Sequence, residues 1–431
     1  MKVSKYNFLY SNVFINDEKS IVYNSRTGAL AVLDKVKVNQ LRDLEVGIQI
    51  KESEFEKNLY NSGYIVDDNI NEINYIKQNL YSQRFDKSYM MLTIAPTMSC
   101  NFACIYCFEK NSQHNDIMVD STIDDIVSFV QHRSKELQKL EILWFGGEPL
   151  IAIQQIKRLS QKLIELCCIE GIEYSSTMST NGYLLNEKII EILIECKVLC
   201  LGISIDGNKE VHDSRRMLKD GNGTYNRIIE NIISASKKIY IDIKITIDKE
   251  NYNTIQTMLD VLKLQGVFDS KKVSVSLHQV QDINDVYQHD KCLSDINFSK
   301  FRLEFMLKND IHLGNIYPKP KGCFCQADQL NSWVIDSLGN LYKCISDIGI
   351  VDKKVSALKD KKINYSNLHS YTIYDPTDEK KCKDCQYLPL CVGGCPYARL
   401  NSNQCCSYWK YNLDEYIKEY AHILLDNATQ K

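Results

Sequence analysis

The segment Ala95-Pro-Thr-Met-Ser-Cys-Asn-Phe-Ala-Cys-Ile-Tyr-Cys-Phe108 places three cysteines at intervals of three and two residues, in a short loop after an apolar run. Thiolates are the soft ligands that iron–sulfur clusters need, so Cys100, Cys104 and Cys107 can hold three irons of a [4Fe-4S] cubane. The fourth iron then has no protein ligand and is open to a substrate or cofactor. A zinc site is the alternative, but zinc knuckles usually close four positions with paired Cys-x2-Cys or His ligands, and no nearby His completes this set convincingly. The spacing therefore predicts a reactive cluster.

This loop, with Tyr106 just before its last cysteine, resembles the signature of the radical S-adenosylmethionine (radical SAM) family. The resemblance implies that the amino and carboxylate groups of SAM chelate the open iron. It implies that one electron from the reduced cluster cleaves the sulfonium to a 5′-deoxyadenosyl radical. The three cysteines are then the catalytic cluster ligands, and Tyr106 is a cofactor-binding residue.

Composition and charge narrow the possible function classes. The chain has 431 residues, 44% of them hydrophobic, which indicates a globular protein large enough for more than one domain. Its 52 basic and 55 acidic residues leave a net charge of −3, which gives no electrostatic case for a nucleic-acid or membrane partner. The N-terminus lacks an uninterrupted apolar segment, so we expect a cytoplasmic protein. In a reducing compartment, 17 cysteines indicate metal or cluster ligation.

Residues 88–278 alternate short apolar runs with longer amphipathic stretches, which predicts six strand–helix units. Such units favour an α/β fold with a parallel, barrel-like sheet, whose chemistry lies at the C-terminal ends of the strands. The family resemblance implies a partial (β/α)6 TIM-like barrel. The predicted strands are Met91–Ala95, Glu141–Phe145, Glu173–Met178, Leu199–Ile205, Tyr240–Ile247 and Val273–Leu277. The predicted helices are Ser121–Leu140, Ile153–Cys168, Asn186–Cys196, Tyr225–Lys237 and Thr254–Leu264.

Residues 1–86 follow a different pattern. The strand-like runs Asn7–Phe14 and Ser20–Leu33, the second broken at residues 24–28, precede helical patterns at Lys37–Leu44 and Glu52–Ser62. This order resembles the winged-helix-like domain that recognises leader peptides in many maturases of ribosomally made peptides. In those domains the leader adds as a strand to an exposed sheet edge. A small cap that only shields the barrel is the alternative, and residues 67–83 are a candidate linker helix.

The motif Gly146-Gly-Glu-Pro149 directly follows the second predicted strand. Paired glycines allow the backbone to approach a ligand closely, and carbonyl or carboxylate oxygens can bind an ammonium group. The family resemblance implies that Gly146, Gly147 and Glu148 hold the amino group of SAM. Taken alone, the motif could be an ordinary strand-to-helix turn.

Two further motifs end predicted strands. Ser179-Thr-Asn-Gly182 ends the third strand and Ser204-Ile-Asp-Gly207 ends the fourth. Their short hydroxyl and amide side chains suit hydrogen bonds to a ribose, which makes Ser179, Asn181, Ser204 and Asp206 cofactor-binding candidates. By resemblance Ser204 is the better of these, whereas Asp206 can instead stabilise the turn through its backbone.

An arginine near the SAM carboxylate is also implied by the resemblance. Arg227, in Thr224-Tyr-Asn-Arg227, occupies the place where related enzymes have it. Arg215 and Arg216 compete for this role, and any of the three could be a solvated helix charge.

Residues 323–406 contain nine more cysteines in an ordered pattern. The pattern is Cys-x13-Gly-x4-Cys, then Cys-x2-Cys-x5-Cys-x3-Cys, then a final pair, and it resembles the SPASM extension of radical SAM enzymes, which binds two auxiliary [4Fe-4S] clusters. The resemblance implies that Cys325, Cys344 and Cys395 ligate the first auxiliary cluster, with Cys323 as a possible fourth ligand. It implies that the second is ligated by Cys382, Cys385, Cys391 and either Cys405 or Cys406.

A pair of zinc ribbons is the alternative for this region, because cysteines at these spacings also suit zinc. The upstream cluster loop makes iron–sulfur clusters the preferred interpretation. The other cysteines are interpreted as small apolar fillers of the barrel; they are Cys167, Cys168, Cys196, Cys200 and Cys292.

The sequence therefore predicts a radical SAM/SPASM peptide maturase with three domains: residues 1–86 for leader recognition, 87–300 for the radical SAM barrel, and 301–431 for the SPASM domain. Its cofactors would be SAM and three [4Fe-4S] clusters, and its product a Cys sulfur-to-carbon thioether, with carbon–carbon and carbon–oxygen crosslinks as alternatives. Its partners would be a precursor peptide with a leader and an electron donor such as flavodoxin or ferredoxin. An anaerobic sulfatase-maturating (formylglycine-generating) enzyme and a non-catalytic, redox-responsive cluster protein are the alternatives.

Overall fold

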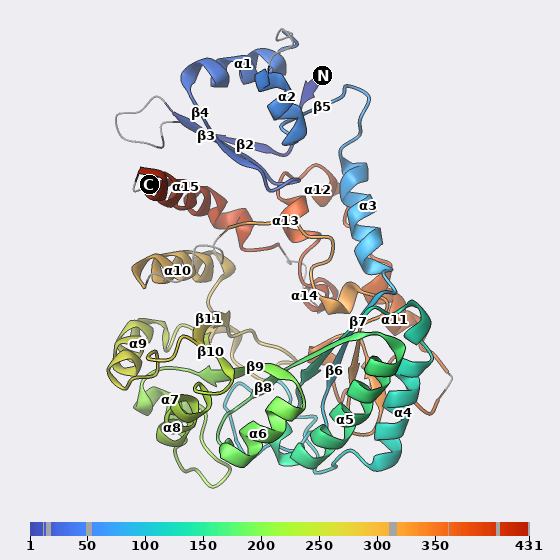
Figure 1. The fold of residues 1–431 in the computed structure, drawn as a ribbon. Coiled ribbons are helices and arrows are strands. Elements are labelled where there is room, and N and C mark those ends of the chain that lie inside the picture. The colour runs from blue at the N-terminus through green and yellow to red at the C-terminus, as the bar shows by residue number, and fades with distance from the viewer. Residues whose placement is uncertain are drawn as a thin grey trace. The chain divides into compact units, whose positions relative to one another are not determined.

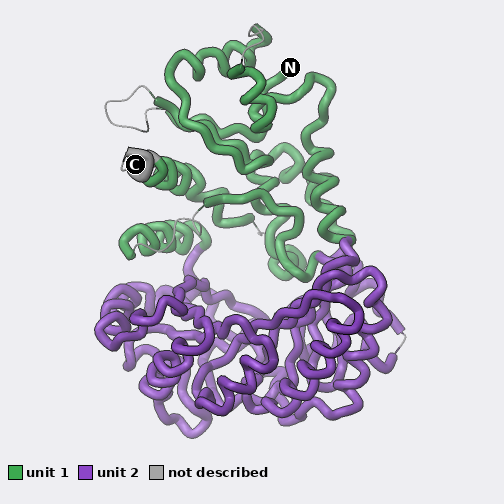
Figure 2. Tube along the Cα trace, in the orientation of Figure 1, with its two compact units in different colours: residues 1–85, 295–328, 373–431 green, residues 86–294, 329–372 purple. Residues whose placement is uncertain are grey.

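The computed structural model describes residues 1–11, 13, 19–48, 54–309, 317–360, 362–401 and 406–429. The chain forms two compact units, shown in different colours in Figure 2. Unit 1 contains residues 1–85, 295–328 and 373–431, and unit 2 contains residues 86–294 and 329–372. Neither unit is continuous in sequence, so the compact units do not follow the three predicted segments. In the described parts of the chain, no helix is both long enough and apolar enough to cross a membrane.

Unit 2 is built on a nine-stranded sheet in the order β11-β10-β9-β8-β7-β6-β12-β13-β14. Figure 1 labels the strands β6 to β11 of this sheet. The first six strands in this order are parallel and confirm the six predicted strands, with shifted ends. They are β6 (Tyr89–Ile94), β7 (Lys139–Trp144), β8 (Glu173–Thr180), β9 (Val198–Ile205), β10 (Tyr240–Ile247) and β11 (Val273–Gln279). The α/β fold is therefore confirmed, with a parallel sheet consistent with a partial TIM-like barrel.

The connecting helices of unit 2 largely match the prediction. They are α4 (Asp120–Gln131), α5 (Ile153–Glu170), α6 (Glu187–Glu195), α7 (Lys209–Arg215), α8 (Tyr225–Ala235), α9 (Ile255–Leu264) and α11 (Tyr365–Thr372). The predicted helix Ser121–Leu140 was wrong at its C-terminal end. Lys139 and Leu140 instead begin β7, because they pair with Tyr89 and Met90 of β6.

The two faces of the parallel strands differ in polarity. Along β10, Ile241, Ile243 and Ile245 are fully buried, while Asp242 and Lys244 between them are only half-buried. A parallel sheet covered on both faces would read as a continuous apolar run. The alternation therefore leaves one polar face on this half-barrel, which suits the binding of polar ligands.

Three strands from the C-terminal part of the sequence extend this sheet. They are β12 (Trp333–Ile335), β13 (Asn340–Tyr342) and β14 (Ser356–Ala357). Strand β12 runs parallel to β6, with Val334 opposite Thr93, and β13 and β14 follow in antiparallel order. Part of the predicted SPASM segment thus belongs to the same compact unit as the barrel.

Unit 1 contains the antiparallel sheet β2-β3-β4 and the small antiparallel pair β1-β5. The strands are β1 (Lys2–Val3), β2 (Asn7–Tyr10), β3 (Ser20–Asn24), β4 (Leu30–Leu33) and β5 (Ile65–Val66). The helices are α1 (Lys35–Glu45), α2 (Glu54–Asn61), α3 (Ile73–Arg84), α10 (Asp295–Lys308), α12 (Lys380–Lys383), α13 (Leu388–Cys391), α14 (Pro396–Asn401) and α15 (Trp409–Thr429). The strand predicted for Asn7–Phe14 ends at Tyr10, and residues 12 and 14 lie outside the described residues.

The three-stranded sheet of unit 1 is covered on both faces (Figure 1). On one face, Val22 and Leu33 pack with Leu41 of α1 and Leu59 of α2. On the other face, the buried side chains come from β2, β3, α10, α13 and α15: Phe8, Ile21, Tyr23, Leu303, Met306, Leu390, Trp409, Leu413, Tyr416 and Ile417. The first strands of the chain and its last helix therefore share one hydrophobic core.

Candidate active site and auxiliary cysteine pocket

The cysteine loop begins immediately after β6, at the C-terminal end of that strand. Its start is anchored by Met98, which is fully buried against Val334 of β12 and Tyr342 of β13. Its middle is held by the segment after α7, because the backbone N–H groups of Ala103 and Ile105 donate to the carbonyls of Met217 (2.9 Å) and Arg215 (3.1 Å). Two sequence-distant segments thus fix the conformation of the loop.

The three cysteines of this loop are half-buried. Burial raises the pKa of the Cys100 and Cys107 thiols to about 12, and the pKa of the Cys104 thiol is also raised by burial. Coordination to iron deprotonates a thiol outright, so cluster binding would overcome this shift. Three thiols on one short loop, with no carboxylate between them, are a donor set suited to an iron–sulfur cluster.

The glycine pair after β7 packs against this loop. A Cβ atom added to Gly146 would lie 2.4 Å from the carbonyl oxygen of Thr97, and Gly146 also has a positive φ of +110°. A Cβ atom added to Gly147 would lie 2.4 Å from the carbonyl oxygen of Ser99. The backbone that comes close to these glycines is therefore that of the cysteine loop itself, which the sequence analysis did not anticipate.

Glu148 connects the ends of two neighbouring strands. Its carboxylate is fully buried and accepts hydrogen bonds from the Thr180 hydroxyl (2.6 Å), the Asn181 backbone N–H (2.7 Å) and the Leu150 backbone N–H (3.0 Å). Burial is the largest influence on its pKa, which lies above the usual value. Glu148 thus acts in this structure as a link between β7 and β8.

The strand-end candidates differ in their surroundings. Asn181 is buried, and its side-chain amide donates to Oδ1 of Asn101 in the cysteine loop (2.8 Å). Ser179 and Ser204 are half-buried on β8 and β9. Lys244 of β10 lies opposite Ser204 in the sheet register, and its Nζ reaches the Ser179 hydroxyl at 3.5 Å. The polar face of the sheet therefore brings both serines into reach of one lysine.

Asp206 belongs to a buried network of charges beside the cysteine loop. Its carboxylate is fully buried and accepts from Nε of Arg215 (3.0 Å), whose Nη2 also donates to Asp248 (2.7 Å). Arg216 is buried as well and donates to the Tyr106 hydroxyl (2.9 Å). These charged groups hold the ring of Tyr106 in place. Asp248 was not predicted as a site residue, because it belongs to no recognisable motif in the sequence.

Arg227 contacts Tyr183 on the polypeptide segment after β8. It is exposed on α8, its guanidinium lies 4.7 Å from the centre of the Tyr183 ring, and its Nε donates to the Tyr183 carbonyl (3.0 Å). Of the three arginines considered from sequence, Arg215 and Arg216 are the ones in contact with Tyr106.

A comparison with protein-family models matches residues 94–262 to the radical SAM superfamily. Residues 94–262 form a radical SAM domain. It contains the cysteine loop, the glycine motif and both serine-bearing strand ends. The radical SAM chemistry makes this chain an enzyme that modifies a substrate, and the alternative of a non-catalytic cluster protein is set aside.

Relatives agree with this assignment. A cysteine-type anaerobic sulfatase-maturating enzyme of Clostridium novyi is 24% identical over 377 residues, which cover 78% of this chain and 97% of that protein. Among solved structures, native anSMEcpe with bound AdoMet and Cp18Cys peptide has a TM-score of 0.59 at 22% identity and covers 79% of this chain and 99% of that one. Streptococcus suis SuiB bound to the precursor peptide SuiA has a TM-score of 0.54 at 17% identity and covers 94% of this chain and 97% of that one.

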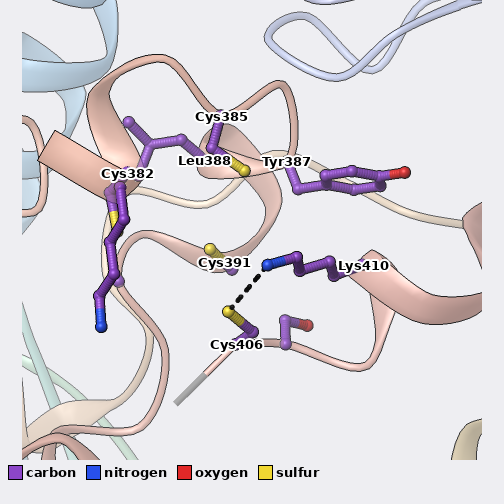
Figure 3. Close-up of a pocket in the computed structure, with 10 residues that line it drawn as sticks. Cys382, Cys385, Tyr387, Leu388, Cys391, Cys406 and Lys410 are labelled. Atoms are coloured by element: carbon purple, nitrogen blue, oxygen red, sulfur yellow. Dashed lines mark hydrogen bonds between the residues drawn. The ribbon is translucent and has the colours of Figure 1, made fainter. Parts of the chain in front are cut away.

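A second group of cysteines lines a pocket of about 390 Å³ in unit 1 (Figure 3). Cys382, Cys385, Cys391 and Cys406 all line it. These are four of the cysteines expected at the second auxiliary cluster, and Cys405 lies outside the described residues. Four thiols around one pocket are a fitting donor set for a fully ligated [4Fe-4S] cluster.

The cysteines expected at the first auxiliary cluster are divided between the units. Cys323, Cys325 and Cys395 belong to unit 1 and Cys344 to unit 2, so this ligand set stays a prediction. Within the described residues, no three Cys, His, Asp or Glu side chains form a group that could hold a single metal ion.

The cysteines interpreted as apolar fillers are not all alike. Cys167 and Cys196 are buried, which fits that interpretation. Cys168 is exposed, so the filler interpretation is wrong for it, because its position on α5 faces away from the buried positions Leu163 and Cys167. Cys200 and Cys292 are half-buried.

Proposed function

We propose that this radical SAM enzyme matures a ribosomally made precursor peptide by joining a cysteine sulfur to a carbon atom. The observation that carries the proposal is the module at the start of the chain. In its described residues, 1–11, 13, 19–48 and 54–85, this module forms the three-stranded sheet β2-β3-β4 with helices α1 and α2 on one face, and it precedes the radical SAM domain in the sequence. The structure of SuiB, which was determined with a precursor peptide, covers 94% of this chain, whereas that of anSMEcpe covers 79%.

The proposed cofactor sites use the cysteines described above. Cys100, Cys104 and Cys107 would hold the SAM-binding cluster, and Cys382, Cys385, Cys391 and Cys406 the second auxiliary cluster. Cys325, Cys344 and Cys395, with Cys323 as a candidate fourth ligand, would hold the first. When bound, these cofactors would supply a radical that takes the hydrogen atom of a peptide C–H bond; as the C–S bond replaces the C–H and S–H bonds, the thiol proton would be released and the cofactors would accept the one remaining electron.

The protein contributes positioning to this chemistry. Glu148 holds the ends of β7 and β8 together, and Asn181 bonds to Asn101 of the cysteine loop. The network of Asp206, Arg215 and Arg216 orients Tyr106, which belongs to the same loop. The half-buried Ser179, Ser204 and Lys244 line the polar face of the sheet, where we expect the SAM ribose and the peptide to bind.

The mass of the product tests the proposal. A cysteine-containing peptide encoded in a small open reading frame beside the gene is incubated anaerobically with reconstituted enzyme, SAM and dithionite. We expect each modified site to lose two hydrogens, and fragmentation to fail between the two joined residues. Release of 5′-deoxyadenosine with an unchanged peptide mass would contradict this choice of substrate.

Sulfatase maturation is the second candidate function. The observation that favours it is the 24% identity to the cysteine-type enzyme of C. novyi over 97% of that protein. Conversion of a cysteine to formylglycine replaces sulfur by oxygen, so the product differs in mass from a thioether and carries an aldehyde. Labelling of a sulfatase-derived cysteine peptide with a hydrazine probe after reaction would favour this function over crosslinking.

We propose the edge strand β4 as the binding site of the leader peptide. Within the described residues β4 pairs with β3 alone, so its outer edge is available for strand addition. The Asn24 N–H donates to the Ala29 carbonyl (2.9 Å), and in an antiparallel ladder the bonded pairs alternate. The N–H groups of Leu30 and Val32 therefore point to the outer edge.

A Val32→Pro variant is expected to bind the leader about fivefold more weakly, because it loses one outward donor worth about 1 kcal/mol. The ladder to β3 does not use this N–H and should survive. Val32→Thr keeps the N–H and is the matched control. Fluorescence anisotropy with a labelled leader peptide measures the affinity of both variants. Equal affinities of the Pro and Thr variants would exclude β4 as the binding site of the leader.

A further inference from the structure

Two lysines line the auxiliary cysteine pocket. Lys381 precedes Cys382 in the chain, and Lys410 lies in the first turn of α15, where Figure 3 shows its side chain directed toward Cys406. The Nζ atom of Lys410 lies 3.7 Å from Sγ of Cys406. Among the described residues that line the pocket there is no carboxylate. The pocket is therefore cationic apart from its thiols.

Lys410 is directed to the thiol rather than to an acidic side chain. The residues that the structure describes include Asp414 and Glu415 on the same helix, but none of the ion pairs involves Lys410. The closest polar contact of its ammonium group is the sulfur of Cys406. A lysine paired with a carboxylate would contribute little net charge to the pocket, whereas Lys410 contributes a full positive charge.

A positive charge 3.7 Å from a ligand sulfur would stabilise the reduced state of a bound cluster more than its oxidised state. One-electron reduction of a cysteine-ligated cluster adds a negative charge to the pocket. A nearby cation stabilises the more negative state, and in a partly buried pocket this attraction is screened less than in water. Charge and hydrogen bonds at the cluster sulfurs are among the factors that set its reduction potential.

We propose that Lys410, assisted by Lys381, raises the reduction potential of the auxiliary cluster at Cys382, Cys385, Cys391 and Cys406, so that this cluster accepts the electron left after bond formation in the peptide. The inference rests on the proposed function. It assigns to Lys410 a tuning role at the cluster, exerted through its charge and its contact with Cys406, and it names an electron acceptor within unit 1.

Potentiometric titration of the reconstituted full chain, followed by electron paramagnetic resonance, tests this role. The signal of this cluster is the one that disappears in a Cys385→Ala variant. We expect Lys410→Met to shift its midpoint potential to a more negative value, Lys410→Arg to leave it close to that of the unchanged chain, and Lys381→Met to add a further negative shift. Lys418→Met, on the same helix but outside the pocket lining, is the control and should cause no shift.

The possible failures are distinguishable. An unchanged potential in Lys410→Met, with the cluster present, would overturn the tuning role and leave the proposed function standing. Loss of auxiliary iron in Lys410→Met but not in Lys410→Arg would overturn it too, because the ammonium group would then serve cluster assembly. If the unchanged chain, fully reconstituted, holds no iron that depends on Cys385, the proposed cluster and the tuning role both fail.

Discussion

Simultaneous replacement of Cys100, Cys104 and Cys107 by alanine is expected to abolish SAM cleavage. These are the three thiols of the loop after β6, so the variant loses the site at which an iron could remain open to SAM. The rate should fall to that of the uncatalysed reaction, a loss of at least about 10⁶-fold. Release of 5′-deoxyadenosine under anaerobic conditions with dithionite measures the effect.

The same variant should keep the iron of the auxiliary pocket, because Cys382, Cys385, Cys391 and Cys406 belong to unit 1 and the cysteine loop to unit 2. Cys168→Ala, which removes an exposed thiol from α5, is the control and should retain both iron and SAM cleavage. Loss of all iron in the triple variant would contradict the independence of the two sites. Continued formation of 5′-deoxyadenosine would contradict the role of the loop.

Gly146→Ala is expected to displace the cysteine loop. The added methyl group would lie 2.4 Å from the Thr97 carbonyl oxygen; that oxygen belongs to the backbone, and the position of Cβ is fixed by the backbone of residue 146, so neither atom can turn away. A displacement of about 1 Å at a reacting centre can lower a rate about 10²-fold, so we expect SAM cleavage to fall by at least this factor. Iron content and 5′-deoxyadenosine release measure the two consequences.

Gly171→Ala is the matched control for this variant. Gly171 caps α5 with a φ of +71°, so an alanine there is strained like one at Gly146, at a cost of about 1–3 kcal/mol. No atom lies within 4 Å of its added Cβ, however. Similar losses of SAM cleavage in both variants would mean that backbone strain, not contact with the loop, explains the effect at Gly146.

Much of the barrel could be predicted because its signals are local. Strands such as β10 show buried apolar residues at alternate positions, and the helices show an apolar stripe at helical spacing, so the strand–helix order could be predicted along the chain. The end of the first helix could not be predicted, because the residues after Gln131 remain amphipathic. Only their pairing with β6 assigns Lys139 and Leu140 to a strand. Strand β12 was missed for a similar reason. It is three residues long, and its partner β6 lies far away in sequence.

In the candidate site, too, the local motifs could be predicted from the sequence but the contacts between them could not. The cysteine loop and the Gly-Gly-Glu-Pro motif were visible as spacings of particular residue types. Their mutual contact was not visible, because a carbonyl oxygen near a missing Cβ leaves no trace in either motif. The buried pairing of Arg215 with Asp206 and Asp248 joins residues from three segments, so sequence alone did not show that Arg215 contacts Tyr106 whereas Arg227 contacts Tyr183.

The sequence by itself determined the α/β class, the succession of six strand–helix units and the radical SAM motif of the first cysteine loop, since residue spacing and hydrophobic periodicity are properties of neighbouring residues. Only the tertiary structure decided that Cys406 joins Cys382, Cys385 and Cys391 around one pocket, and that Lys410 faces them. It alone decided that β2 and β3 share a core with α15 at the other end of the chain. These contacts arise from burial of apolar surface between distant segments, and burial depends on the whole fold rather than on any local pattern.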